Sequence, residues 1–139
     1  MGLSDLAGVW NLQDSINFDE YLKQCGIGYL TRKLAATIKP VLTITVDGDN
    51  VSINSCSTFK NHTTSFKLNQ EFEENSIDGR VFKTIFTWAN EKLIQKQTAI
   101  KPEDKASVME RYVKDGKLFI DMDCEGVKAQ RIYTKAENK

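Results

Sequence analysis

The sequence lacks most of the residue patterns on which enzymes, metal centres and secreted disulfide scaffolds depend. It has one histidine, His62, and three cysteines, with no Cys-x-x-Cys pair and no Gly-x-Ser-x-Gly motif. A single histidine supports neither a His-rich zinc site nor the usual nucleophile–base arrangements. The widely spaced Cys25, Cys56 and Cys124 suit a thiol-reducing compartment better than an oxidising one. We therefore expect a cytoplasmic protein that is not an enzyme and holds no metal or cofactor.

An excess of charge of one sign and long apolar runs are missing as well. Nineteen Lys and Arg residues balance nineteen Asp and Glu residues, which gives a formal net charge of +0. A general nucleic-acid binder needs a cationic surplus, so nucleic acid is not an expected partner. No apolar run is long enough to span a bilayer, and the N-terminus has no signal-peptide pattern. A hydrophobic content of 40% over 139 residues predicts one folded domain, spanning residues 1–139.

Helical patterning is confined to two short helices over about residues 17–38. Asn17 and Glu20 have the spacing of a capping box at the start of the first helix. Gly26 can end that helix in a left-handed conformation, and Pro40 stops the second one. A DNA-reading helix-turn-helix would need a basic recognition helix in a cationic domain, which the neutral charge does not support.

The rest of the chain has the pattern of short strands separated by polar turns. A first strand is expected over residues 6–12, and residues 41–46 are rich in β-branched side chains. The turn at 47–50 is a strong hairpin signal, and similar turns recur to the C-terminus, with His62 in one of them. About ten such strands predict an all-β, antiparallel up-and-down barrel with the helical pair as a lid. A barrel of about ten strands should enclose a cavity that holds something small.

Alternation along three predicted strands places polar side chains among apolar ones. Residues i and i+2 of a strand share a face, so Arg131 lies with Tyr133 and Arg111 lies with Met109. Gln97 belongs to a third such row. Facing a cavity, these rows would offer guanidinium forks and a phenol to a carboxylate. The spacing alone leaves inward and outward orientations of the two arginines equally open, because nineteen acidic residues are available as outward partners.

A set of short motifs also occurs in a fixed order along nearly the whole chain. The motifs are GVWNL at 8–12, NFDEYL at 17–22, GIG at 26–28, TR at 31–32, KP at 39–40, STFKN at 57–61, FKL at 66–68, EFEE at 71–74, DGR at 78–80, DGKL at 115–118 and RIY at 131–133. This ordered set resembles the cytosolic fatty-acid-binding proteins of the intracellular lipid-binding family, in the lipocalin superfamily. The resemblance is closest to the heart, adipocyte and myelin type.

The resemblance implies a calycin-like barrel that carries long-chain fatty acids reversibly, with no bond made or broken. It implies that two arginines and a tyrosine hold the carboxylate, and these roles fall on Arg111, Arg131 and Tyr133. The cavity and portal positions fall on Phe18, Tyr21, Leu22, Ala35, Phe59, Lys60, Ile77, Asp78, Gln97 and Met109. Retinol-binding members carry glutamine where these arginines stand, so the resemblance favours an acid over an alcohol.

Three departures from the family pattern bear on these expectations. Residues 98–105 form a longer stretch than usual, and the turn chemistry around Pro102 predicts that the extra residues lengthen a hairpin turn. A register shift there would turn Arg111 to the outer face. Cys25 stands where an aliphatic or basic residue is usual, and Ile77 is bulkier than the usual portal residue and would narrow the opening.

We expect a monomer that takes up and releases its ligand by movement of the helical lid. The predicted helices and their flanks carry a cluster of basic residues, Lys23, Arg32, Lys33 and Lys39. This cluster is explained equally well by a solvated surface and by transient contact with anionic membranes. A retinoic-acid carrier is the alternative, since that ligand is also an apolar acid, and a lipid-modifying enzyme is a remote one. The two arginines are expected to be interior cations whose counter-charge comes from the ligand.

Overall fold

The structure, a computed structural model, describes residues 2–136 as ten strands, a short 3-10 helix and two α-helices. The strands are β1 (Gly8–Ile16), β2 (Val41–Asp47), β3 (Asn50–Cys56), β4 (Asn61–Lys67), β5 (Phe72–Asn75), β6 (Val81–Ala89), β7 (Lys92–Ala99), β8 (Ser107–Lys114), β9 (Lys117–Cys124) and β10 (Val127–Lys135). The helices are η1 (Leu3–Leu6), α1 (Phe18–Gln24) and α2 (Tyr29–Thr37).

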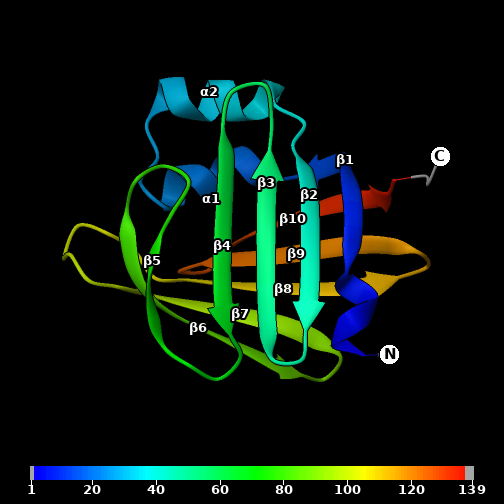
Figure 1. Ribbon diagram of the computed structural model, residues 1–139. Helices are drawn as coiled ribbons and strands as arrows, with labels where there is room; N and C mark the ends of the chain where they lie inside the picture. Colours follow the sequence, from blue (N-terminus) through cyan, green and yellow to red (C-terminus); the bar gives the residue numbers. More distant parts are fainter. Residues whose placement is uncertain (1, 137–139) are drawn as a thin grey trace.

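All ten strands join one antiparallel sheet that curls into a nearly closed barrel (Figure 1). The strand order is β4-β3-β2-β1-β10-β9-β8-β7-β6-β5, so β1 pairs with β10 and the sheet edges are β4 and β5. In Figure 1, β2–β4 cross in front of β6–β10, and the two helices cover one end. The predicted fold class, an antiparallel up-and-down barrel with a helical lid, is confirmed.

Stacked phenylalanine rings connect the two edges of the sheet. Phe66 on β4 stacks on Phe86 of β6 with ring centroids 3.6 Å apart, and Phe72 on β5 lies 6.1 Å from Phe86. The backbone N–H of Asn69, in the connection between β4 and β5, donates to the Phe86 carbonyl at 2.8 Å. Parallel aromatic stacking therefore links β4 to β5 and β6, where no strand pairing joins β4 to either strand.

Strict alternation on the central strands defines an inner and an outer face. On β9, the side chains of Leu118, Ile120, Met122 and Cys124 are buried, and the residues between them are half-buried. The indole of Trp10 on β1 is buried in the same core, and its Nε1–H donates to the Leu6 carbonyl at 2.9 Å. The inner face is thus apolar over most of its area, and polar residues on it are exceptions that need partners.

Three local predictions are corrected by the structure. The first strand is β1, which begins at Gly8, because the residues before it form η1. Asn17 adopts a left-handed conformation with φ 58°, and its side-chain amide donates to the Lys128 carbonyl at 2.7 Å instead of capping α1. Asparagine tolerates this conformation, which the turn from β1 into α1 requires. His62 lies within β4 rather than in a turn, with Nε2 2.8 Å from the Asn75 carbonyl oxygen.

The two lid helices differ in how they are held. In α1, Tyr21 is buried, and so is Cys25, the residue that caps the C-terminus of this helix. The helix packs against β10 and β9. In α2, no residue is buried, and Leu30 is 81% exposed. Gly26, with φ 92°, separates the helices as predicted. Neither α1 nor α2, nor any other helix within residues 2–136, is long and apolar enough to cross a membrane.

Candidate functional site

Arg111 and Arg131 lie in one row that runs across four strands on the inner face. Cross-strand pairing joins Arg111 on β8 to Ile120 on β9, Ile120 to Arg131 on β10, and Arg131 to Ser15 on β1. Cross-strand partners point to the same face, and Ile120 is buried, so both arginines point inward. Two strand spacings separate their main chains by about 10 Å. That separation allows two long guanidinium side chains to approach one anion.

Arg111 is surrounded by protein, although part of its side-chain surface remains accessible. Its Nη1 donates to the Gln95 side-chain carbonyl at 2.9 Å, and the guanidinium lies 5.8 Å from the Phe86 ring centroid. Its Nε–H is buried with no hydrogen-bond partner among the described residues. Burial lowers the pKa of Arg111, and the carboxylate of Glu74 opposes that shift. An unsatisfied buried donor costs about 1–3 kcal/mol, so this N–H favours an acceptor.

Arg131 lies directly beneath the lid. Its Nε donates to the Ser15 hydroxyl at 3.1 Å, and its guanidinium stacks over the Phe18 ring of α1 at 4.1 Å from the centroid. Burial also lowers the pKa of Arg131, which the nearby Tyr133 opposes. Its described partners are a neutral hydroxyl and an aromatic face, and neither supplies a full negative charge.

Tyr133 is buried two residues further along β10, on the same face as Arg131. Burial raises the pKa of its phenol, and the charges of Arg131 and Arg111 act in the opposite direction. The phenol is therefore neutral near pH 7 and can donate a hydrogen bond. Met109, two residues before Arg111 on β8, packs against the core. The three residues predicted to hold a carboxylate thus occupy one region of the interior.

A buried carboxylate that the sequence analysis did not identify lies in the same interior. Glu74 on β5 is 7% exposed and accepts hydrogen bonds from Thr84 Oγ1 at 2.7 Å and from Gln95 Nε2 at 2.9 Å. Gln97, a predicted cavity residue, donates to it from Nε2 at 3.1 Å. Gln95 also accepts from Arg111, so one amide connects the acid to the cation. The expectation that the chain supplies no interior counter-charge is wrong: within residues 2–136 one buried carboxylate, Glu74, accompanies the two arginines.

A hollow of about 430 Å³ opens beneath the lid and reaches Arg131. Its lining includes Ser15 on β1, Phe18 and Leu22 on α1, and Ala35 on α2. The Phe18 ring also stacks with Tyr21, whose hydroxyl shares a 2.5 Å hydrogen bond with Ser107 on β8. Phe18, Leu22 and Ala35 therefore border an opening that leads to Arg131, and Tyr21 packs behind Phe18 outside its lining.

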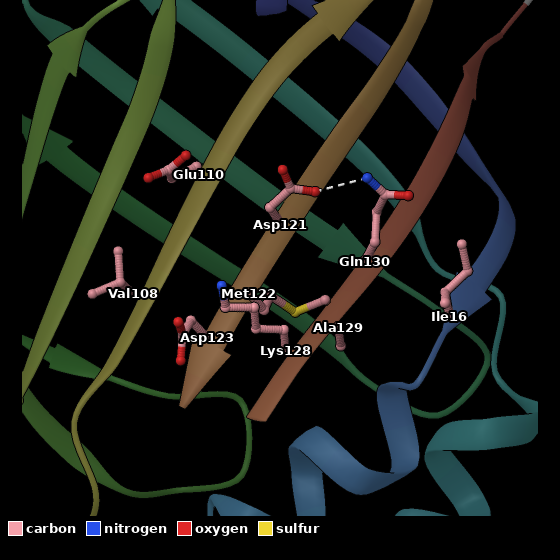
Figure 2. A pocket seen from close by; sticks show the side chains of 9 residues that line it. All are labelled: Ile16, Val108, Glu110, Asp121, Met122, Asp123, Lys128, Ala129 and Gln130. Carbon is pink, nitrogen blue, oxygen red and sulfur yellow. Dashed lines mark hydrogen bonds between the residues drawn. The ribbon is translucent and has the colours of Figure 1, made fainter. Parts of the chain in front are cut away.

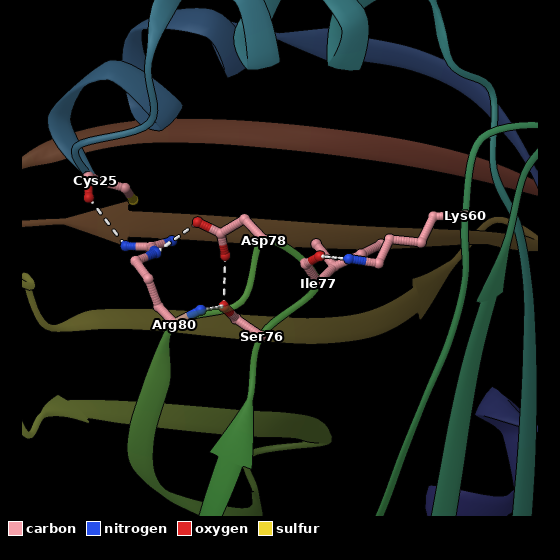
Figure 3. Close-up of polar contacts among 6 residues, drawn as sticks. All are labelled: Cys25, Lys60, Ser76, Ile77, Asp78 and Arg80. Atoms are coloured by element: carbon pink, nitrogen blue, oxygen red, sulfur yellow. Dashed lines mark hydrogen bonds and ion pairs between the residues drawn. The ribbon is translucent and has the colours of Figure 1, made fainter.

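Four of the predicted portal residues lie on two neighbouring turns, Phe59 and Lys60 before β4 and Ile77 and Asp78 before β6. Figure 3 shows Lys60, Ile77 and Asp78 close to the lid. Phe59, between β3 and β4, is 61% exposed, and Ile77, between β5 and β6, is 45% exposed. Lys60 connects the turns, because its Nζ donates to the Ile77 carbonyl. Asp78 pairs with Arg80 Nε at 2.6 Å. Two large apolar side chains at the surface, each on a turn rather than in a strand, are suited to contact an apolar chain passing between barrel and lid.

A second hollow, of about 480 Å³, lies on the outer face of β8–β10 (Figure 2). Cross-strand pairs place Glu110 beside Asp121 and Asp123 beside Lys128, and Gln130 donates to Asp121 at 2.8 Å. Carboxylates predominate over cations in this lining. The outer hollow is therefore a poor site for an anionic ligand.

The longer connection before β8 leaves the register intact. Residues 100–106 form the turn, in which Asp104 N–H donates to the Lys101 carbonyl at 3.1 Å. β7 and β8 then pair regularly, with Leu93 opposite Arg111. The extra residues lengthen the hairpin turn as expected, and no register shift turns the Arg111 side chain to the outer face.

Comparisons with known proteins agree with this architecture. Residues 7–136 match the lipocalin / cytosolic fatty-acid binding protein family. The chain is 44% identical to Fatty acid-binding protein homolog 6 of Caenorhabditis elegans over 94% of this chain and 97% of that protein. The apo crystal structure of C. elegans lipid binding protein 8 superposes with a TM-score of 0.94, at 37% identity, over 98% of this chain and 99% of that one.

A third comparison concerns a structure that contains a ligand. The Schistosoma mansoni fatty acid binding protein in complex with arachidonic acid matches with a TM-score of 0.90, at 32% identity, over 99% of this chain and 100% of that one. The names of these relatives describe binding proteins and not enzymes, in agreement with the sequence-based expectation. The barrel with its helical lid and the match over almost the entire chain place the chain in the lipocalin / cytosolic fatty-acid binding protein family.

Proposed function

We propose that the protein is a carrier that reversibly binds long-chain fatty acids, with the carboxylate held by Arg111, Arg131 and Tyr133. The observation that carries the proposal is the interior charge. Among the described residues, Glu74 is the one buried carboxylate; it connects to Arg111 through Gln95, which leaves the positive charge of Arg131 for an anionic ligand. The Arg111 Nε–H, which has no partner within residues 2–136, and the neutral Tyr133 phenol add donors for the ligand's oxygens.

The apolar tail supplies most of the binding free energy. Burying one methylene contributes about 0.8 kcal/mol, so a long acyl chain contributes on the order of 10 kcal/mol before the costs of ordering it. The buried side chains along the inner face and the partly buried Phe18, Leu22 and Met109 offer the apolar surface. The arginines and tyrosine then orient the ligand and select an acid over an equally long alcohol.

We further propose a path for the ligand between α2 and the two portal turns. The α2 helix buries none of its residues, so its displacement costs little apolar burial. Phe59, Ile77 and Ala35 would contact the tail in passage, and Lys60 and Asp78 fix the turns through their contacts with Ile77 and Arg80.

The surface of the lid also suits transient docking on an anionic membrane. Leu30 on α2 is exposed, and the exposed Lys33 lies on the same helix, whereas Arg32 pairs with Asp19 at 3.1 Å. In this proposal the protein is a cytosolic monomer, a single domain over residues 1–139, of which 1 and 137–139 lie outside the described residues.

Membrane docking is tested by the rate at which a fluorescent fatty acid passes from the protein to vesicles. The transfer rate should rise with the anionic lipid content and fall with added salt. A rate that depends on neither would exclude docking.

The carboxylate site is tested with two ligands of equal chain length. We expect Arg131→Gln to weaken oleate binding by about tenfold to a hundredfold, the range for loss of a charge-assisted hydrogen bond, and to leave oleyl alcohol unaffected. Lys128→Gln, an exposed substitution on the same strand, is the matched control. Titration calorimetry on delipidated protein measures all six affinities. Equal losses for both ligands would show that Arg131 is only structural.

Retinoic acid is the second candidate ligand, because two arginines and a phenol would serve any apolar acid. Competition between oleate and retinoic acid for the wild-type protein separates the two, and we expect oleate to displace retinoic acid.

A further inference from the structure

Two buried cysteines meet where the lid joins the barrel. Cys25 is the C-terminal cap of α1, and Cys124 is the last residue of β9. Both belong to the hydrophobic core, with Cys25 6% and Cys124 0% exposed. They are far apart in the sequence but neighbours in space, because α1 packs against β9 and Cys25 contributes to the raised pKa of the Cys124 thiol. The third cysteine, Cys56, is exposed at the end of β3.

Neighbouring contacts hold both thiols in place. The Tyr21 hydroxyl, one turn before Cys25, bonds to Ser107, and the Ser107 hydroxyl donates to the Asp123 carbonyl at 3.1 Å. On the other side, Arg80 Nη1 donates to the Cys25 carbonyl at 3.0 Å (Figure 3). The main chains on either side of the thiol pair are therefore fixed to the barrel, which keeps the two sulfurs together.

We propose that Cys25 and Cys124 form a redox modification site, a dithiol that closes to a disulfide under hydrogen peroxide and fastens α1 to β9. One sulfur, as its thiolate, attacks a peroxide oxygen, the O–O bond breaks, and a sulfenic acid and one water result. The second sulfur then attacks the sulfenic sulfur, the S–S bond forms, and the oxygen leaves as a second water. Two electrons pass from the two sulfurs to peroxide, which is reduced to water.

The closed lid delays the first of these steps. Burial and the contact with Cys25 raise the pKa of the Cys124 thiol well above its ordinary value, so the thiolate that attacks peroxide is scarce. Because both thiols are buried, peroxide reaches the pair only during brief local opening of the packing around them. The adjacent second thiol then captures the sulfenic acid before a second peroxide can oxidise it further.

The test uses a Cys56→Ser background, which removes the exposed thiol. After treatment of the folded protein with hydrogen peroxide and alkylation, we expect an intact mass lower by two hydrogen atoms and one linked peptide pair containing Cys25 and Cys124. Cys25→Ser and Cys124→Ser in that background are the matched controls, and each should yield sulfinic acid and no linked peptide. Recovery of both thiols as alkylated cysteine, or of sulfinic acids with both cysteines present, would overturn the proposal.

Amide hydrogen exchange on the oxidised protein provides a second readout. Because the cross-link fastens α1 and leaves α2 beyond Gly26 free, exchange in α1 should slow by about tenfold or more and exchange in α2 should change by less than about twofold. Equal slowing in both helices, or none in α1, would contradict the placement of the cross-link.

Discussion

The two inward arginines differ in what the chain provides for them. Arg111 is surrounded by protein and connects through Gln95 to the buried carboxylate of Glu74. Arg131 lies beneath the lid, against the Ser15 hydroxyl and the Phe18 ring, and borders the hollow of about 430 Å³. One cation is thus largely neutralised from within, and the other is accessible from the hollow.

This difference assigns the arginines unequal roles in the proposed site. Arg111 is fixed by the network that it neutralises, so its removal affects folding as well as binding. Arg131 contributes less to the fold and provides more of the attraction for a ligand carboxylate. Strand pairing places both arginines in one row, and their different side-chain partners determine how much of each positive charge is left for a ligand.

The largest expected effect is on stability. Arg111→Leu should lower the free energy of unfolding by about 3 kcal/mol, because it leaves Glu74 buried without its nearest cation. Arg131→Leu should cost about 1 kcal/mol, the value of a cation–π contact with a neutral hydroxyl partner. Urea unfolding of both variants without ligand measures the two values, and equal losses would remove the distinction between the arginines.

The next effect is on affinity. Glu74→Gln removes the interior carboxylate, so both arginines become available to a ligand, and we expect oleate to bind about tenfold more tightly. Glu73→Gln, an exposed substitution on the same strand, is the control and should change the affinity less than twofold. An unchanged oleate affinity in Glu74→Gln would show that this carboxylate does not compete for the arginines.

A smaller effect concerns the orientation of Arg131. Phe18→Leu removes the ring over its guanidinium while keeping an apolar side chain, and should weaken oleate binding about threefold more than it weakens binding of oleyl alcohol. Phe119→Leu is the control, since Phe119 stacks with Tyr112 and pairs with outward positions. Identical losses for the two ligands would mean that Phe18 only contacts the tail.

The smallest effect is on the pH dependence of stability. Burial raises the pKa of Tyr133, so the folded state holds this proton more tightly than the unfolded chain, whose tyrosines lose it near pH 10. Stability is therefore unaffected below about pH 10 and falls above it, by at most about 1.4 kcal/mol per pH unit for this group. Tyr133→Phe should make the decline shallower without abolishing it, because burial also raises the pKa of Tyr21 and of Tyr112. Urea midpoints between pH 9 and 11 measure the slopes; parallel slopes would contradict the assignment.

Much of this architecture could be predicted from the sequence, because strand alternation and turn chemistry are local signals. The barrel, the lid and the common face of Arg131 and Tyr133 follow from them. The orientation of Arg111 did not follow, since it depends on the register across the long turn before β8. Glu74 was missed because β5 has only four residues, too few for alternation to indicate a face. The conformation of Asn17 was missed because it depends on a contact with Lys128, distant in the sequence.

Carbon-13 NMR of oleate labelled at its carboxyl carbon tests the proposed carboxylate site most directly. Bound to the wild-type protein, the carboxyl should stay ionised through pH 4–5, the ordinary range for a carboxylic acid, because Arg111 and Arg131 stabilise its charge. In Arg131→Gln the resonance should shift and begin to titrate in that range. A wild-type signal that titrates like that of a solvent-exposed acid, with no change in the variant, would contradict the site.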